Sequence, residues 1–279
     1  MPSLAPCANC AHRLPVSTVQ TTHLRLVFGD VVAVDDLTLS IDSGSIFGLL
    51  GPNGAGKSSI IKMLTTLVPP TSGTASVAGF DIVREPARVR GKIGYVPQAL
   101  SADGALTARE NLTLSARLYG IPNGVRRQRI DEMLSFMELN EARDRLVKTY
   151  SGGMIRRVEL AQAMLHQPEV LFLDEPTIGL DPIACHAVRD RLMALRARSG
   201  MTILLTTHDM DEADELCDRI AILHQGVIAT LGKPEELKAS VGPQATLEDV
   251  FTHFAGGTIA EGGTYHDVRE TRRIARRLG

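Results

Sequence analysis

The segment from Gly51 to Ser58 combines residue types whose spacing predicts a specific chemistry. It has the form G-x-x-x-x-G-K-[ST], and it lies between a short apolar run and a stretch of helical character. In this context the backbone N–H groups of a glycine-rich loop wrap phosphates at a helix N-terminus. We expect Lys57 to reach the β and γ phosphates of a nucleotide and Ser58 to hold Mg²⁺. The predicted nucleotide-binding residues of this loop are Gly51, Pro52, Asn53, Gly54, Ala55, Gly56, Lys57, Ser58 and Ser59.

Two adjacent carboxylates, Asp174 and Glu175, end the apolar run 170–173. Adjacent residues of a strand point to opposite sides of the pleat, so their roles should differ. Asp174 fits a contact with Mg²⁺ and its water, and Glu175 is placed to polarise a water for attack on a γ phosphate. An acidic pair at a strand end is commonly only a polar cap. The phosphate loop upstream favours the catalytic interpretation.

The run Tyr150-Ser-Gly-Gly-Met154 separates the classes of protein that the phosphate loop leaves open. Kinases and GTPases share that loop, but they would carry this run only by accident. With it, residues 19–234 resemble the ABC ATPase superfamily, whose signature is usually written LSGGQ. The other family motifs follow in order: Gln98 at the Q-loop, Asp174 and Glu175 at the Walker B pair, Gly179 to Asp181 at the D-loop, and His208 at the switch histidine.

The signature of this chain departs from the usual form at two positions, with Tyr150 for leucine and Met154 for glutamine. The Ser151 hydroxyl and the amides of Gly152 and Gly153 can still donate to a γ phosphate from a helix N-terminus. The YSGGM form resembles the branch of drug and antibiotic exporters of the daunorubicin-resistance type. The segment 246–251 (TLEDVF) also resembles that branch.

The resemblance implies roles for residues that are ambiguous alone. A lone histidine such as His208 is more often an ordinary surface or core group, and Phe28 would by default be a core or edge-strand aromatic. In the family, the switch histidine contacts the γ phosphate, and an aromatic at the position of Phe28 stacks on adenine. Gln98 is expected among both the catalytic and the metal-binding residues.

The resemblance also implies an assembly. It is a head-to-tail homodimer in which each ATP lies between one subunit's phosphate loop and the other's Ser151, Gly152 and Gly153, with Asp181 near the shared interface. Closure on ATP and reopening after hydrolysis would drive a separate transmembrane permease. We therefore expect an ATPase subunit that powers transport, by analogy the export of a drug, an antibiotic or another small hydrophobic compound.

The elements that position these residues follow from the hydrophobic periodicity. Residues 21–50 alternate as antiparallel strands with a turn at Asp35-Asp36, and the run 45–50 is a strand that leads to a helix over 58–67. Helices are expected after the capping box of Thr107 and Glu110, over 125–139, from about Gly153, and after positions 182 and 209. Strands are expected at 170–174 and 202–206, with a closing hairpin at 221–229. The pattern predicts an α/β fold: a RecA-like phosphate-loop NTPase core with an antiparallel β flank and a helical insertion subdomain.

The expected domain organisation has three parts. Residues 1–18 form a flexible lead, residues 19–232 the ABC ATPase domain with its insertion at about 98–150, and residues 233–279 a C-terminal appendage with a basic tail. The lead contains Cys7, Cys10 and His12, which lack a fourth ligand for a metal site, so a loose lead is favoured. The tail arginines favour a solvated face over a membrane or permease contact; they are Arg269, Arg272, Arg273, Arg276 and Arg277.

The composition agrees with a globular protein and excludes some partners. The 279 residues are 44% hydrophobic and 22% charged with a formal net charge of -2, so no overall field would gather nucleic acid. No apolar run approaches the roughly 18 residues that span a bilayer, and no signal peptide is evident. We expect a cytoplasmic protein, held at the inner face of the membrane through its permease. The main rival is an ABC-type ATPase that acts on nucleic acid or the ribosome; such relatives usually carry two ATPase halves or a long coiled-coil insertion.

Overall fold

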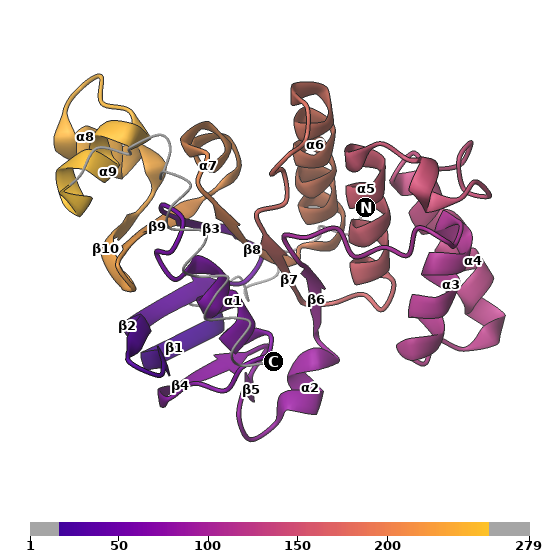
Figure 1. The fold of residues 1–279 in the computed structure, drawn as a ribbon, viewed down its shortest axis with the longest axis horizontal. Helices are drawn as coiled ribbons and strands as arrows, with labels where there is room; N and C mark the ends of the chain where they lie inside the picture. Colours follow the sequence, from indigo (N-terminus) through magenta and orange to yellow (C-terminus); the bar gives the residue numbers. More distant parts are fainter. Residues whose placement is uncertain (1–16, 257–279) are drawn as a thin grey trace, which may run out of the picture.

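A six-stranded sheet forms the centre of the molecule. The computed structural model describes residues 17–256, and in this range the sheet has the strand order β10-β9-β3-β8-β7-β6 (Figure 1). Its neighbouring strands are parallel except for β10, which pairs antiparallel with β9. The strands are β3 (Ile46–Leu50), β6 (Ile93–Val96), β7 (Val170–Asp174), β8 (Thr202–Thr207), β9 (Arg219–His224) and β10 (Val227–Gly232). The predicted α/β core is confirmed, as is the closing hairpin.

The central strands are buried on both faces, as expected for a parallel sheet that is covered on both sides. Every residue of β3, β7 and β8 is buried. Along β7, Leu171 and Leu173 pack into one hydrophobic cluster while Val170 and Phe172 pack into another. The alternation follows the two-residue period of a strand. The first cluster contains the helices α5 (Gly152–Met164), α6 (Pro182–Ser199) and α7 (Met210–Leu216).

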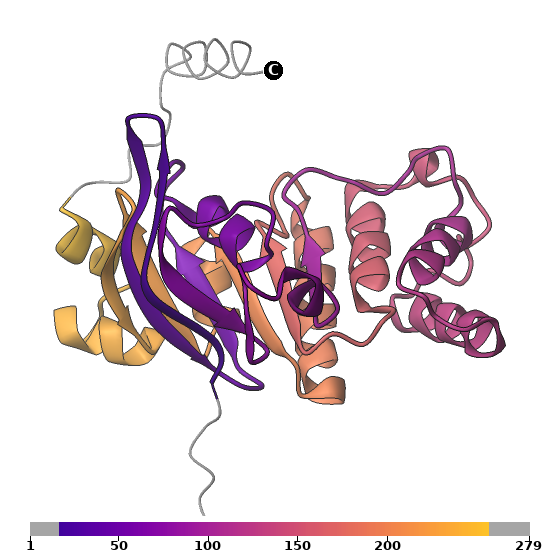
Figure 2. The same ribbon diagram turned by 90° about the horizontal axis from the view of Figure 1, so that it is seen from below.

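The second cluster lies between the central sheet and an antiparallel sheet with the order β2-β1-β4-β5. Its elements are β1 (Ser17–Phe28), β2 (Val31–Asp42), β4 (Ser72–Val77), β5 (Phe80–Asp81), and the helices α1 (Lys57–Leu64) and α2 (Pro86–Arg90). Figure 2 shows this sheet layered against the central one. The antiparallel flank predicted from the sequence is confirmed.

The predicted turn at Asp35-Asp36 is wrong. The chain reverses at Gly29 and Asp30, where Gly29 has φ 56, a left-handed value that costs glycine little. Asp35 and Asp36 lie inside β2, where the register shifts by one residue between the Leu26–Val34 and Leu24–Leu37 pairs. Such a shift is a β-bulge, which inserts an extra residue without ending the strand.

The helical insertion lies beside α5, on the opposite side of the molecule from α8 and α9 (Figures 1 and 2). It contains α3 (Ala108–Leu118), α4 (Asn123–Phe136) and the short 3-10 helix η1 (Val147–Thr149). The capping box of Thr107 and Glu110 is confirmed at the start of α3. The second helix begins two residues earlier and ends three earlier than predicted, with Pro122 at its N-cap and Met137 at its C-cap. The helix α1 likewise ends at Leu64, before the predicted Leu67.

Two further helices, α8 (Pro234–Val241) and α9 (Leu247–Ala255), pack on the β9–β10 hairpin and α7. Leu237, Val250 and Phe251 are buried in the same cluster as the central sheet. A second capping box, of Thr246 and Asp249, begins α9. The basic tail and the Cys7, Cys10 and His12 cluster lie outside the described residues. Among the residues that are described, no helix has the length and apolar character needed to cross a membrane.

Candidate active site

The phosphate loop connects the buried strand β3 to α1, so its position is fixed by the central sheet. Gly56, the N-cap of α1, has φ 102, and a Cβ there would lie 2.5 Å from the carbonyl oxygen of Ala33. A side chain is therefore excluded by both conformation and space. The loop therefore ends at the N-terminus of α1, the position at which backbone amides can receive an anion.

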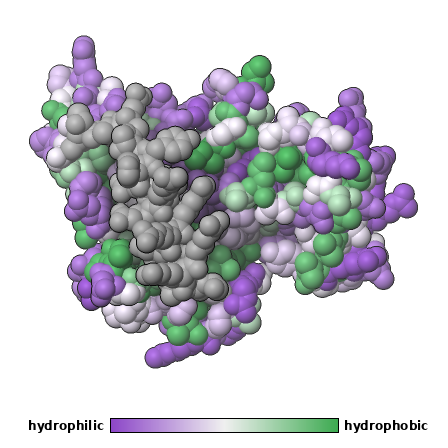
Figure 3. Space-filling model, viewed as in Figure 1, coloured by the Kyte–Doolittle hydropathy of each residue, from purple (hydrophilic) through white to green (hydrophobic). Residues whose placement is uncertain are grey.

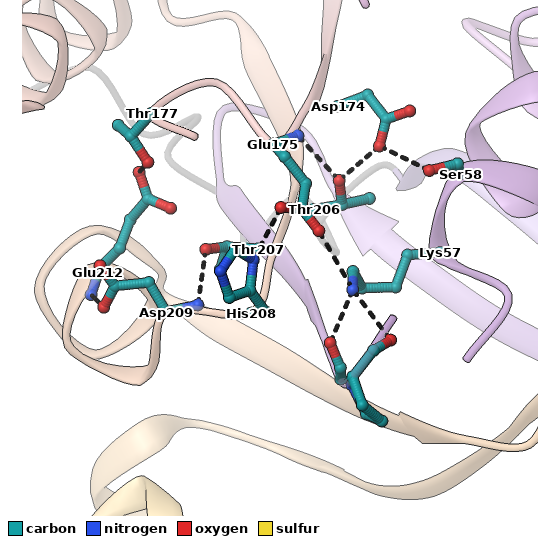
Figure 4. A network of polar contacts seen from close by, with 12 residues as sticks. Lys57, Ser58, Asp174, Glu175, Thr177, Thr206, Thr207, His208, Asp209 and Glu212 are labelled. Atoms are coloured by element: carbon teal, nitrogen blue, oxygen red, sulfur yellow. Dashed lines mark hydrogen bonds and ion pairs between the residues drawn. The ribbon is translucent and has the colours of Figure 1, made fainter. Parts of the chain in front are cut away.

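Lys57 extends from the first residue of α1 back across this loop. Its Nζ donates to the carbonyl oxygens of Gly51 (2.6 Å) and Pro52 (3.1 Å) and lies 3.2 Å from Oε1 of Glu175 (Figure 4). The side chain is only 4% exposed. These contacts hold the ammonium group of Lys57 against the phosphate loop.

Asp174, at the end of β7, contacts the second residue of α1, Ser58. Its Oδ1 accepts hydrogen bonds from the hydroxyls of Ser58 (3.0 Å) and Thr206 (2.7 Å). Thr206 is the direct partner of Asp174 in the β7–β8 pairing. The sequence analysis assigned no role to Thr206, although its position at the end of the neighbouring strand is the signal that could have found it. Ser58 and Asp174 thus present two oxygen ligands of the kind that Mg²⁺ prefers.

Glu175 points in a different direction from Asp174 (Figure 4). The pleat does not explain this difference, because β7 ends at Asp174 and Glu175 has a left-handed backbone. Its carboxylate contacts Lys57 through Oε1 and the Nδ1 atom of His208, 2.7 Å away, through Oε2. Glu175 is 5% exposed, whereas His208 is half exposed. The backbone of Glu175 has a φ of 49, which is uncommon for a non-glycine residue. Its amide donates a hydrogen bond to Oγ1 of Thr206. Backbone strain of this kind gathers at functional sites.

The buried carboxylate of Glu212 connects the segment that follows Glu175 to the helix that follows His208. Oε1 of Glu212, in the helix that follows His208, accepts a hydrogen bond from the hydroxyl of Thr177, two residues after Glu175. Burial raises the pKa of Glu212, and hydrogen bonds from Thr207 and Thr177 oppose the shift. Glu212 and Thr177 were not singled out from the sequence, because they meet only in the folded chain (Figure 4).

The phosphate loop, Glu175 and Gln98 line a cavity of about 290 Å³. Residues Pro52 to Ser59 line this cavity, together with Val31, Val32 and Ala33. Phe28 is half exposed and lies opposite Val31 in the β1–β2 pairing, outside the described lining. The structure therefore brings the phosphate-loop residues and Gln98 together at one cavity. Phe28 lies next to this cavity through its pairing with Val31. Val31 and Val32 line the cavity but were not predicted from the sequence.

The signature residues line a separate cavity of about 180 Å³. Ser151 is the N-cap of α5 and accepts a hydrogen bond from the amide of Met154. Ser151 and Gly153 face the same cavity as Asp181, the N-cap of α6. A Cβ on Gly153 would lie 2.6 Å from the Cβ of Ala184, so glycine permits the close approach of the two helices. Within one described chain, these residues and the phosphate loop line different cavities.

The fold and the first cavity define a phosphate-loop nucleoside triphosphatase, and comparisons with known proteins narrow the class. The family model described as ABC transporter matches residues 34–178. The chain belongs to the ABC transporter family; it is the ATP-binding subunit and hydrolyses ATP to power transport. This confirms the family, fold class and activity expected from the signature and sets aside the kinase and GTPase alternatives.

Individual relatives agree. The chain is 46% identical over 228 residues to the daunorubicin/doxorubicin resistance ATP-binding protein DrrA of Streptomyces peucetius, covering 82% of this chain and 69% of that protein. It is 40% identical over 261 residues to Nod factor export ATP-binding protein I of Burkholderia lata, covering 90% and 86%. A solved ATP-binding subunit of an ABC transporter superposes with a TM-score of 0.76 at 29% identity, covering 85% and 99%. ATP-binding subunits of ABC exporters work with a membrane permease.

Proposed function

We propose that Glu175 is the catalytic base of ATP hydrolysis, and that Lys57 and His208 contact the phosphates on either side of it. The observation that carries this assignment is a nearly buried carboxylate placed 3.2 Å from Lys57 Nζ and 2.7 Å from His208 Nδ1. Lys57 would hold the β and γ phosphates, and His208 would contact the γ phosphate. A carboxylate held between them can orient and polarise the attacking water.

Ser58, Asp174 and Gln98 are the proposed residues for Mg²⁺. The fit rests on the oxygen atoms of Ser58 and Asp174, 3.0 Å apart, and on Gln98 in the lining of the same cavity. Mg²⁺ is usually held by one or two carboxylates together with substrate phosphates, and it neutralises charge on the phosphate oxygens. Asp174 is kept in place by Thr206, so the carboxylate is oriented before any ligand binds.

A head-to-tail homodimer would complete the site, with Ser151, Gly152, Gly153 and Asp181 of one copy facing the phosphate loop of the other. Two observations support this. The signature residues line a cavity that does not include the phosphate loop of the same chain. Ile183, which borders the signature cavity, is 82% exposed, so an apolar side chain is available for a contact with a second copy.

The transported substrate class follows from the relatives. We assign this subunit to the export of a drug, an antibiotic or another small hydrophobic compound, because its relatives are named for drug resistance and for export. The partner would be a separate transmembrane permease, with the subunit cytoplasmic and peripheral at the inner face of the membrane. Exposed hydrophobic residues in and near the insertion suit such a contact; they include Leu100, Leu114, Leu118 and Tyr119. Figure 3 shows hydrophobic surface on the face that carries α5.

The domain division proposed for this function is a lead at 1–18, the ATPase domain at 19–232 with the insertion at about 98–150, and the appendage from 233. Because α8 and α9 pack on the β9–β10 hairpin and bury residues in the central core, we infer that the appendage stabilises this hairpin.

Co-purification with a candidate permease tests the export proposal. The complex, reconstituted in vesicles, is expected to hydrolyse ATP faster when a hydrophobic drug is added and to move that drug in the direction of export. A complex that forms but transports only in the import direction would contradict the proposed direction. The ATPase assignment would stand in that case.

Phe28→Ala is expected to weaken ATP binding by about 1 to 3 kcal/mol, because a base stacked on an aromatic ring loses that contact. The turnover of bound ATP should change little. Phe254→Ala is the matched control, since Phe254 is also a partly exposed aromatic but lies on α9. Calorimetric titration with ATP reads the affinity. Equal affinity in the parent and in Phe28→Ala would place adenine on other residues, such as the valines of the cavity.

A further inference from the structure

Arg156 and Glu159 form a buried ion pair on α5, a feature that the functional assignments above do not use. Nη1 of Arg156 lies 2.9 Å from Oε2 of Glu159. The two residues are 1% and 3% exposed, and Arg156 is among the largest fully buried side chains in the described chain. Both stand on the helix whose N-cap is Ser151.

The pair is bonded to the segment that contains Gln98. Arg156 donates through Nη1 to the carbonyl oxygen of Pro97 (2.7 Å) and through Nη2 to that of Gln98 (2.8 Å). Oε1 of Glu159 accepts from the hydroxyl of Ser101 (3.1 Å), from the amide of Ala102 (3.3 Å), and from the amide of Ser101. The contacts therefore hold the backbone at Gln98 and on both sides of it.

Stability alone does not account for this arrangement. Burying two charges costs several kcal/mol per ion, and well-packed apolar residues often stabilise a fold equally well. Burial lowers the pKa of Arg156, while the charges of Glu159 and Asp174 oppose the shift. What the pair supplies is geometry, because a planar guanidinium can bind two adjacent carbonyls and a carboxylate in one fixed orientation.

We propose that Arg156 and Glu159 are positioning residues for ATP hydrolysis that act through Gln98. They set the backbone from which the Gln98 side chain reaches the phosphate-loop cavity. They also join that backbone to α5, the helix whose N-cap is Ser151. The inference rests on the proposed function, since it takes Gln98 as part of the catalytic site.

Arg156→Lys tests the geometry while retaining the charge opposite Glu159. A lysine cannot bind both carbonyls as the guanidinium does, so kcat is expected to fall by about 10-fold or more, as small misplacements in active sites do. The affinity for ATP should stay near that of the parent. Arg191→Lys is the matched control, because Arg191 also bridges a carbonyl (Phe136) and a carboxylate (Glu138) but away from the cavity. Thermal unfolding of each variant checks the fold.

The decisive comparison places Arg156→Lys in a Gln98→Ala background. If Arg156 acts through Gln98, the substitution lowers kcat in the parent but adds little once Gln98 is absent. Equal losses in both backgrounds would overturn the inference in favour of a merely structural role. An unchanged kcat for Arg156→Lys in the parent would also overturn it. A Gln98→Ala protein with parental kcat would remove the proposed role of Gln98 itself, and the inference with it.

Hydrogen exchange gives a second readout that does not depend on turnover. The amides of Ser101 and Ala102 are expected to exchange faster in Glu159→Ala than in the parent, with those of α6 unchanged. Parental exchange at both amides in this variant would contradict the proposed hold of Glu159 on the segment.

Discussion

Replacing Lys57 by alanine is expected to lower the affinity for ATP by about 100-fold or more, because each charge-assisted hydrogen bond to phosphate contributes about 1.5 to 3 kcal/mol. The structure explains why no neighbour can substitute. Nζ is held by the carbonyls of Gly51 and Pro52 at the mouth of the loop, in a position shielded from water. The loop amides would remain and would give weak residual binding.

Calorimetric titration with ATP measures this effect directly. Lys62→Ala is the matched control, because Lys62 stands on the same helix but is exposed and far from the loop's carbonyls. Removing Lys57 also leaves the buried Glu175 without its cation, which destabilises the fold. Circular dichroism must therefore show a folded variant. Parental affinity in a folded Lys57→Ala protein would remove the phosphate loop from the account.

Glu175→Gln is expected to reduce ATP hydrolysis by about 100-fold or more, within the range for loss of a general base. Glutamine keeps the size and the reach of the side chain but loses the negative charge that polarises water. ATP binding should survive, because Lys57, Ser58 and the loop amides are unchanged. The β phosphate and γ phosphate would replace the lost carboxylate as partners for the Lys57 ammonium.

Phosphate release under saturating ATP and Mg²⁺ measures the rate, and nucleotide recovered from the protein shows whether bound ATP stays intact. Glu169→Gln is the control, since this carboxylate lies at the other end of β7 and pairs with Lys92 on the surface. A Glu175→Gln protein that hydrolyses ATP at the parental rate would contradict the assignment of the base. Asp174 would then have to carry more than the metal contact.

The parts of the site that could be predicted from the sequence are those in which a few consecutive residues fix both geometry and chemistry. The phosphate loop, the pair Asp174-Glu175 and the helix that begins after Ser151 are of this kind, and the structure places each on the expected element. Gly56 shows why: its conformation and its contact with Ala33 leave no alternative residue.

The parts that were missed depend on contacts between distant segments. Thr206 bonds to Asp174 across 32 positions, and Arg156 bonds to Gln98 across 58. No local periodicity reports such pairs. The turn at Gly29 was misplaced because an acidic pair resembles a turn in sequence, whereas a bulge accommodates Asp35 and Asp36 within β2. Chemistry was therefore more predictable than the positioning groups behind it.

The molar mass of Glu175→Gln in solution tests the central claim most directly. That claim is that the phosphate loop binds ATP, that ATP stays uncleaved without Glu175, and that Ser151 of a second copy completes the binding site. Static light scattering with ATP and Mg²⁺ is predicted to give twice the 30.1 kDa of the single chain, because ligand shared by two copies favours the dimer by mass action. With ADP the mass should remain that of one chain. A single-chain mass at saturating ATP, with intact ATP recovered from the protein, would contradict the shared site.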